Sequence, residues 1–226
     1  MSISDPIKLV NPAQRFYQWS GSKGVWQFYD KETKSNVPIP VSFQVIVLDQ
    51  LSTITGFDSV SESGIYSNEI HFFNEILTVK SHKGGEIVKG LYQEITPKLA
   101  SVGAKYAKSV YCAVIRQGKP LEIINIKFSG SALSSLIESK VRDGDTLELS
   151  PSTEVLKKGA TKYFAPKVVK VNTEVVLFQE SLELDRTQLK PFFAQYKKAV
   201  PEIVINSVIE DDLPVFDTSD YTPMPY

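Results

Sequence analysis

The chain has 226 residues, 42% of them hydrophobic and 23% charged, and a formal net charge of −1. This composition is typical of one large globular domain, and the single cysteine, Cys112, excludes an internal disulfide. No stretch has the form of a signal peptide or approaches the roughly 20 apolar residues of a membrane-spanning helix, so we expect a soluble intracellular protein.

The charge is unevenly distributed along the chain. Six of the 26 acidic residues and none of the 25 basic residues lie in residues 199–226, so residues 1–198 carry a formal charge of +5. Such an asymmetry is typical of nucleic-acid binding or of an interaction tail. We therefore expect two parts, a folded basic domain (1–198) and an acidic, disordered C-terminal tail (199–226).

The first half of the chain favours extended structure. Alternation predicts a strand at Gly24–Asp30, a turn at Lys31–Asn36 and a second strand at Pro38–Leu48. Residues Ser52–Asn68 are rich in turn formers and predict a structured loop, after which Glu69–Lys80 returns to extended character.

The second half mixes strands with helices. The pattern predicts helices at Glu86–Leu99, Ala132–Ser139 and Asp185–Ala199, the last with Pro191 near its start. Two strand pairs are expected, a hairpin of Lys108–Arg116 with Leu121–Phe128, and Thr146–Leu149 with Tyr163–Val171. The fold class is therefore mainly β with inserted helices (α+β), and the best-known such fold that binds oligonucleotides is the antiparallel OB-fold barrel.

Basic and aromatic side chains are interleaved in the body. Binding to single strands without sequence preference needs cations for phosphates and flat rings for bases. If residues 105–111 are extended, Tyr106 and Lys108 share one face and Lys105 lies on the other. The predicted DNA contacts are Lys105, Tyr106, Lys108, Lys157, Lys158, Lys162 and Tyr163, with Trp19 and Trp26 as a second set for which core packing is an equal alternative.

The tail combines acids with apolar anchors. Asp211-Asp212-Leu213-Pro214-Val215 resembles the acidic, proline-containing tip of bacterial single-stranded DNA-binding proteins, and the terminal Pro225-Tyr226 is similar to their closing Pro-Phe. Here the acids do not lie at the very end and the last residue is Tyr. Three segments of the body (47–57, 63–69 and 104–111) resemble a phage or prophage group of single-stranded DNA-binding proteins with an OB-fold body and an acidic tail.

This resemblance implies a protein of phage DNA replication or recombination, acting in the cytoplasm of a bacterial host. It implies that the tail recruits replication or recombination proteins and competes with DNA for the binding groove. The recruiting residues would be Asp211, Asp212, Leu213, Phe216 and Tyr226, with either Leu213–Phe216 or Pro225-Tyr226 as the docking segment.

Signatures of enzymes are missing from the sequence. The two histidines, His71 and His82, have no partner at metal-ligand spacing, and no phosphate-binding loop or nucleophile motif is present. We therefore expect a non-enzymatic protein without a cofactor or metal. The alternative is a structural or adaptor protein of a phage virion, which would show no salt-sensitive DNA affinity.

Overall fold

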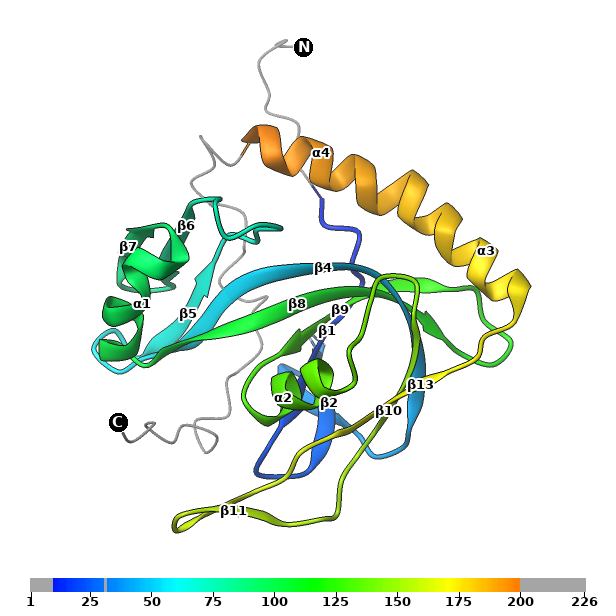
Figure 1. The fold of residues 1–226 in the computed structure, drawn as a ribbon, viewed down its shortest axis with the longest axis horizontal. Coiled ribbons are helices and arrows are strands. Elements are labelled where there is room, and N and C mark those ends of the chain that lie inside the picture. Colours follow the sequence, from blue (N-terminus) through cyan, green and yellow to red (C-terminus); the bar gives the residue numbers. More distant parts are fainter. Residues whose placement is uncertain (1–9, 31, 200–226) are drawn as a thin grey trace.

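The computed structural model describes residues 10–30 and 32–199, and these residues form a mainly β structure (Figure 1). The acidic segment that contains Asp211, Asp212, Leu213, Phe216 and Tyr226 lies outside the described residues. Among the described residues, no helix combines the length and the apolar character that crossing a membrane requires.

Thirteen strands and five helical segments are described, and α3, η1 and α4 follow one another without a break. The strands are β1 (Phe16–Ser20), β2 (Val25–Asp30), β3 (Ser35–Ile39), β4 (Phe43–Asp58), β5 (Ser63–Ser67), β6 (Leu77–Ser81), β7 (Gly85–Gly90), β8 (Ala104–Ile115), β9 (Glu122–Phe128), β10 (Thr146–Ser150), β11 (Leu156–Lys158), β12 (Thr161–Tyr163) and β13 (Lys167–Val171). The helical segments are α1 (Tyr92–Ser101), α2 (Ser131–Glu138), α3 (Val175–Leu184), the π-helical η1 (Asp185–Leu189) and α4 (Lys190–Ala199).

The long strands β4 and β8 are the axis of one large mixed sheet. Its order is β3-β2-β1-β9-β8-β4-β5-β6-β7, with β10 on the first half of β4 and β13 on β10. The β1–β9 pair is parallel, whereas the other pairs are antiparallel. A bulge between Val47 and Asp49 shifts the register of β4 and re-aims the side chains that follow it.

One part of the sheet is strongly curved and encloses the main core, with α2 packed against it. We call this part the curl; its strands are β13, β10, β4, β8, β9, β1 and β2. Val110, Cys112 and Phe128 are among the fully buried members of the main core, and burial raises the pKa of the Cys112 thiol. Two backbone hydrogen bonds, Ser152 N to the Gly24 carbonyl and Phe164 N to the Gly21 carbonyl, link the ends of the curl. The strand ladder does not close, so the expected barrel is not confirmed.

The other end of the sheet carries a second core. Ile54 and Ile65 of the sheet pack with Ile95 and Leu99 of α1, which returns the chain from β7 to β8. Gly103, with φ 73°, makes the left-handed turn that ends this helical connection.

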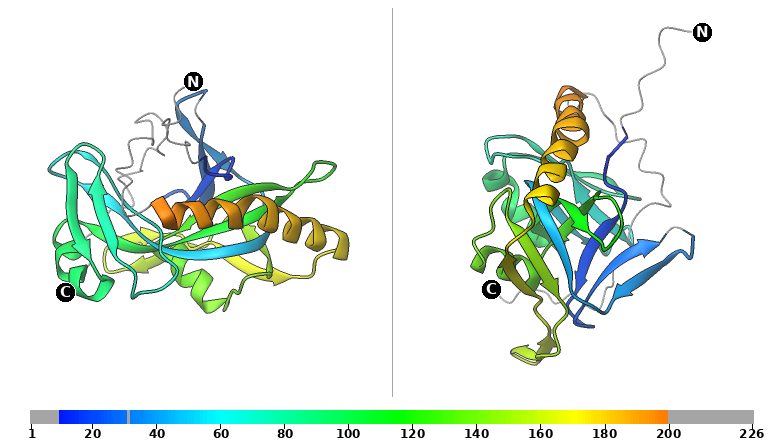
Figure 2. Two further views of the ribbon diagram at one scale, coloured as in Figure 1. Left: turned by 90° about the horizontal axis from the view of Figure 1, so that it is seen from above. Right: turned by 90° about the vertical axis from the view of Figure 1, so that its right-hand side faces the viewer.

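The continuous α3-η1-α4 rod lies across the sheet face opposite the main core (Figures 1 and 2). Phe192 and Phe193 of α4 pack with Leu51, Tyr111 and other buried residues of that face. Because Val110 belongs to the main core while Tyr111 packs under α4, the expected alternation of residues 105–111 is confirmed.

Most expected elements form. The strand ending at Asp30, the 108–128 hairpin, the short α2 helix, the β10–β13 pair and the C-terminal helix are all present. The C-terminal helix begins ten residues earlier than expected, at Val175, and contains Pro191 in its last segment. The expected strand at 163–171 forms only over Lys167–Val171, because Tyr163 is the last residue of a short hairpin, β11–β12, and residues 164–166 are irregular.

Three expectations were wrong. Residues 52–68 form the end of β4 and all of β5, because Thr53 and Thr55 suit a pleated surface and Gly56 allows the backbone of Gly103 to approach closely. Most of the expected extended segment at 69–80 is a loop, and only Leu77–Ser81 is a strand. Residues 86–90 belong to β7, where β-branched Ile87 and Val88 favour a strand over the expected helix start.

Candidate nucleic-acid interface

Three aromatic rings from distant parts of the sequence meet on one face of β8. Tyr106 of β8 lies with its ring centroid 6.0 Å from Phe73 and 5.5 Å from Tyr92, and the Phe73 and Tyr92 centroids are 5.4 Å apart. Phe73 comes from the loop of residues 68–76 and Tyr92 from the first position of α1. We call these three residues the aromatic cluster.

Strand pairing and a hydroxyl contact hold Tyr106 in the aromatic cluster. Tyr106 pairs with Ile54 on β4, and its hydroxyl is 2.9 Å from the Ser52 hydroxyl one position further along the same face. This contact fixes the far end of the ring, while the partial burial of the side chain raises the pKa of Tyr106. Phe73 remains 50% exposed, so the cluster presents apolar ring surface to solvent.

Cations lie beside the cluster. Lys108 is two residues from Tyr106 on the same strand and therefore shares its face. Burial lowers the pKa of Lys108, and the nearby Asp143 and Asp49 carboxylates oppose that shift. Lys108 is therefore a partly desolvated cation, and desolvation strengthens its attraction for an anion.

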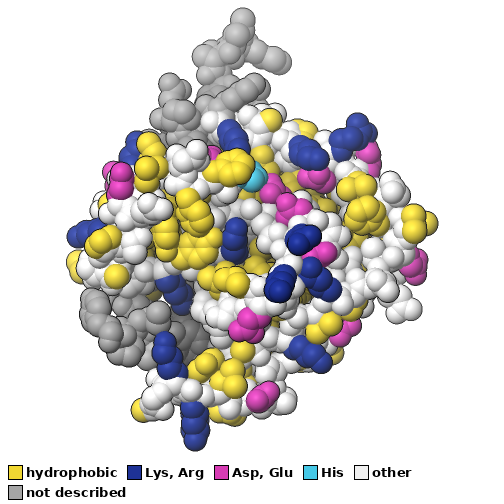
Figure 3. Space-filling model, in the orientation of Figure 1, with side chains coloured by type: hydrophobic (Ala, Val, Ile, Leu, Met, Phe, Trp, Pro, Cys, Tyr) yellow, Lys and Arg dark blue, Asp and Glu magenta, His cyan; other side chains and the backbone are white. Residues whose placement is uncertain are grey.

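Three further basic residues lie around the turn before β10, where the acids Asp143 and Asp145 lie among them, and we call these three the basic patch. Its members are Lys140, Arg142 and Lys170. Lys170 bonds the Asp145 carboxylate at 2.7 Å and the Lys140 carbonyl at 2.8 Å. Gln50 of β4 ties the turn to the sheet, because its side-chain amide donates to Asp143 at 3.0 Å. Figure 3 shows hydrophobic side chains gathered left of centre on this face, with Lys and Arg side chains beside them.

The arrangement can bind a polyanion that carries flat groups. Bases stack on aromatic side chains whatever their sequence, and each neutralised phosphate adds a salt-dependent term to the affinity. One exposed and two half-buried rings beside a partly desolvated lysine provide both kinds of contact on one face of β8.

Lys105 is separated from this surface, as the alternation of β8 requires. It lies on the opposite face, in a row of cross-strand neighbours with Thr55, Tyr66 and Lys80. The Tyr66 ring stacks on His82 with centroids 4.3 Å apart. Burial and the nearby Lys127 lower the pKa of His82 to about 4, so this imidazole is neutral at physiological pH.

The predicted lysine contacts of residues 157–163 form a separate hairpin. In β11–β12, Lys157 lies directly opposite Lys162, Lys158 opposite Thr161, and Leu156 opposite Tyr163. The three lysines are exposed and Tyr163 is half-buried. The hairpin projects from the end of the curl, away from the aromatic cluster (Figure 1), so the structure does not bring these two sets of predicted contacts together.

The two indoles are not stacking platforms, which corrects the second set of predicted contacts. Trp26 is completely buried and packs edge-on against Trp19 and Phe128, with centroid distances of 5.3 Å for both pairs. Trp19 is 9% exposed and donates its indole N–H to the Phe164 carbonyl at 3.1 Å. Both rings fill the main core, so neither face is open to a base.

Sequence reasoning missed Phe73, Tyr92 and the basic patch. The available signal for Phe73 was a pair of adjacent aromatics, Phe72-Phe73, inside a segment bounded by Asn68 and Asn74. Tyr92 follows Gly90 and Leu91 at a helix start, a position with no signature of its own. Its role depends on α1 folding back against β8, which no local pattern specifies.

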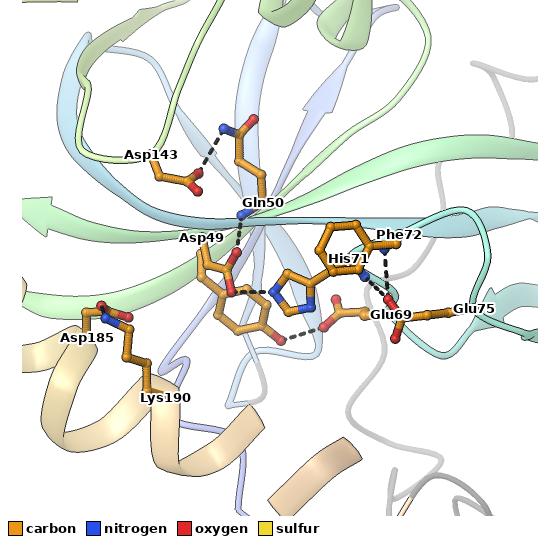
Figure 4. Close-up of polar contacts among 10 residues, drawn as sticks. Asp49, Gln50, Glu69, His71, Phe72, Glu75, Asp143, Asp185 and Lys190 are labelled. Carbon is orange, nitrogen blue, oxygen red and sulfur yellow. Dashed lines mark hydrogen bonds and ion pairs between the residues drawn. The ribbon is translucent and has the colours of Figure 1, made fainter. Parts of the chain in front are cut away.

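A histidine–carboxylate pair lies near the cluster but forms no metal centre. His71 Nε2 is 2.9 Å from an Asp49 carboxylate oxygen (Figure 4). The Ser109 and Tyr111 hydroxyls donate to Glu69. Within residues 10–30 and 32–199, no group of three or more His, Cys, Asp or Glu side chains could hold a metal ion.

No family model matches the chain, and neither a curated protein nor a solved structure shows significant similarity to it.

Proposed function

We propose that this protein binds single-stranded DNA without sequence preference, through the aromatic cluster, Lys108 and the basic patch. The observation that carries the proposal is the cluster of one exposed ring, Phe73, and two half-buried rings, Tyr92 and Tyr106, beside a partly desolvated lysine. Stacking platforms adjoining cations are the general device by which proteins hold single strands. The protein would act in phage DNA replication or recombination, in the cytoplasm of a bacterial host.

We propose that β4, β8, β9 and β10 correspond to the first four strands of an OB-fold, with α2 between the third and fourth. Oligonucleotides bind OB-folds at the second and third strands and at the loops between strands 1–2 and 4–5. In this correspondence the β4–β8 connection contains Phe73 and Tyr92, and the β10–β13 connection contains the lysine hairpin.

Fluorescence anisotropy of a labelled oligo-dT at two salt concentrations tests the binding. We expect affinity to fall with salt, and Tyr106→Ala to weaken binding about 5- to 150-fold because one stacked base is worth about 1–3 kcal/mol. Tyr106→Phe keeps the ring and loses only the contact with Ser52, so it is the matched control and should bind nearly as wild type. Absence of salt-sensitive binding by the wild-type chain would reject the proposal and favour the virion-protein alternative.

We also propose that the acidic tail recruits partner proteins and competes with DNA. A chain ending at Asn206 loses five of the six acids of residues 199–226. It should bind oligo-dT more tightly than the full chain at low salt, because a competing polyanion is removed. Equal affinities for the two chains would limit the tail to recruitment or solubility.

A further inference from the structure

A second aromatic side chain in the 68–76 loop, Phe72, is not part of the aromatic cluster. Phe72 is 67% exposed, and its only ring neighbour among the described residues is His71, at a centroid distance of 6.2 Å. Ile76 of the same loop is 52% exposed. The loop thus places a large apolar side chain in solvent immediately beside a surface suited to bases.

The backbone beneath Phe72 is tightly held (Figure 4). One carboxylate oxygen of Glu75 accepts hydrogen bonds from the backbone N–H of His71 at 2.9 Å and of Phe72 at 2.8 Å. The backbone N–H of Glu75 closes the turn on the Phe72 carbonyl at 3.0 Å. These three bonds fix the direction in which the Phe72 side chain leaves the loop.

Both ends of the loop are anchored to the rest of the protein. At its base, the Asn68 side chain donates to the Ile76 carbonyl and accepts from the Thr78 N–H, at 2.9 and 2.7 Å. His71 is held by Asp49 on one side and by the edge of Phe193 on the other. These contacts hold the loop backbone in one conformation. Binding of a ligand therefore costs little conformational entropy of the loop.

We propose that Phe72 is a wedge that opens duplex DNA at a junction with a single strand. Apolar side chains inserted between base steps unstack them. Because the backbone of this loop is already fixed, inserting Phe72 costs less ordering entropy than insertion from a flexible loop would. The inference rests on the proposed function, because the cluster beside Phe72 would hold the single-stranded arm and direct Phe72 at the terminal base pair. Lys108 and the basic patch supply the cations that the phosphates of that arm require.

Opening kinetics distinguish a wedge from simple trapping. A protein that only traps single strands captures ends that open spontaneously, so the opening rate at saturating protein equals the rate of fraying. A wedge lowers the barrier itself, and the rate should exceed fraying by about tenfold if the wedge supplies one base's worth of stacking. The substrate is a short fluorophore–quencher duplex with a single-stranded dT arm, mixed with the full chain by stopped flow.

Substitutions at Phe72 separate the opening of the duplex from the binding of single strands by the aromatic cluster. Phe72→Ala should slow opening to the fraying rate and leave oligo-dT affinity unchanged, whereas Phe72→Leu keeps an apolar wedge and should retain most of the opening rate. Val176→Ala, which truncates a 65% exposed side chain on α3, is the matched surface control. Opening no faster than fraying in wild type, or an equal loss of opening and of oligo-dT affinity in Phe72→Ala, overturns the wedge. Absence of oligo-dT binding by wild type would instead reject the proposed function.

Discussion

At the residue scale, burial decides which aromatics can meet a base. Trp26 and Tyr106 both lie on strands among mixed neighbours, yet Trp26 is fully buried and Tyr106 is only half-buried. The difference arises from position along the sheet. Trp26 points into the curl that encloses the main core, whereas Tyr106 lies where β8 runs out beyond that core. The alternation of residues 105–111 could be read from the sequence, but the depth of each ring could not.

His82 gives a test of the face opposite the aromatic cluster. Its folded-state pKa, about 4, lies below the ordinary value of 6.5 because of burial and the neighbouring Lys127. The unfolded chain therefore binds the extra proton first, and the stabilisation from a neutral His82 is complete above pH 6.5 and is lost as pH falls toward 4.

The expected outcome is a free energy of unfolding that falls between pH 6.5 and 4, measured by urea denaturation across that window. His82→Gln has no titrating group at this position, so part of the decrease should disappear in that variant. An unchanged pH dependence in His82→Gln would contradict the assignment of a half-buried, neutral imidazole near Lys127.

At the element scale, the β11–β12 hairpin carries like charges directly opposite each other. The Lys157–Lys162 pair is unfavourable for the hairpin itself, and a two-stranded hairpin has little stability of its own. Nearby phosphates would relieve that repulsion. The hairpin belongs to the β10–β13 connection, which is one of the oligonucleotide-binding loops in the proposed OB-fold correspondence.

Replacing Lys157 and Lys162 by Gln should therefore leave the fold intact and reduce the salt dependence of DNA binding. If each lysine neutralises one phosphate, the slope of log affinity against log salt changes by about 1.4. Lys34 and Lys119, exposed in two other turns, are the matched pair for the control. Equal slopes in the two double variants would show that the hairpin does not contact DNA.

The sequence predicts those elements whose turn residues or hydrophobic spacing lie within the element itself. The 108–128 hairpin has its turn signal at Gly118, and α2 has helical spacing of Leu133, Leu136 and Ile137. The β4–β5 segment was not predicted because its polar Ser and Thr residues resemble a loop. Their strand geometry depends on pairing with β8, a tertiary contact.

At the scale of the whole molecule, one sheet serves two purposes. Its curled half encloses the main core and leaves the lysine hairpin at the rim, while its extended half carries α1, the 68–76 loop and the aromatic cluster. The candidate site is assembled from three segments distant in sequence, so only Tyr106 and Lys108 could be predicted from a local pattern. Phe73 and Tyr92 reach the same surface because α1 and the loop fold against β8.

Photocrosslinking tests the central claim most directly. An oligo-dT in which 5-iodouracil replaces single thymines crosslinks to aromatic side chains stacked on the substituted base, and mass spectrometry of the digested complex identifies the residues. If bases stack on the aromatic cluster, crosslinks form at Phe73, Tyr92 or Tyr106 and are lost in the presence of excess unlabelled oligo-dT. Crosslinks confined to the opposite face, for example at Tyr66, would contradict binding at the aromatic cluster and place the DNA on the row that contains Lys105.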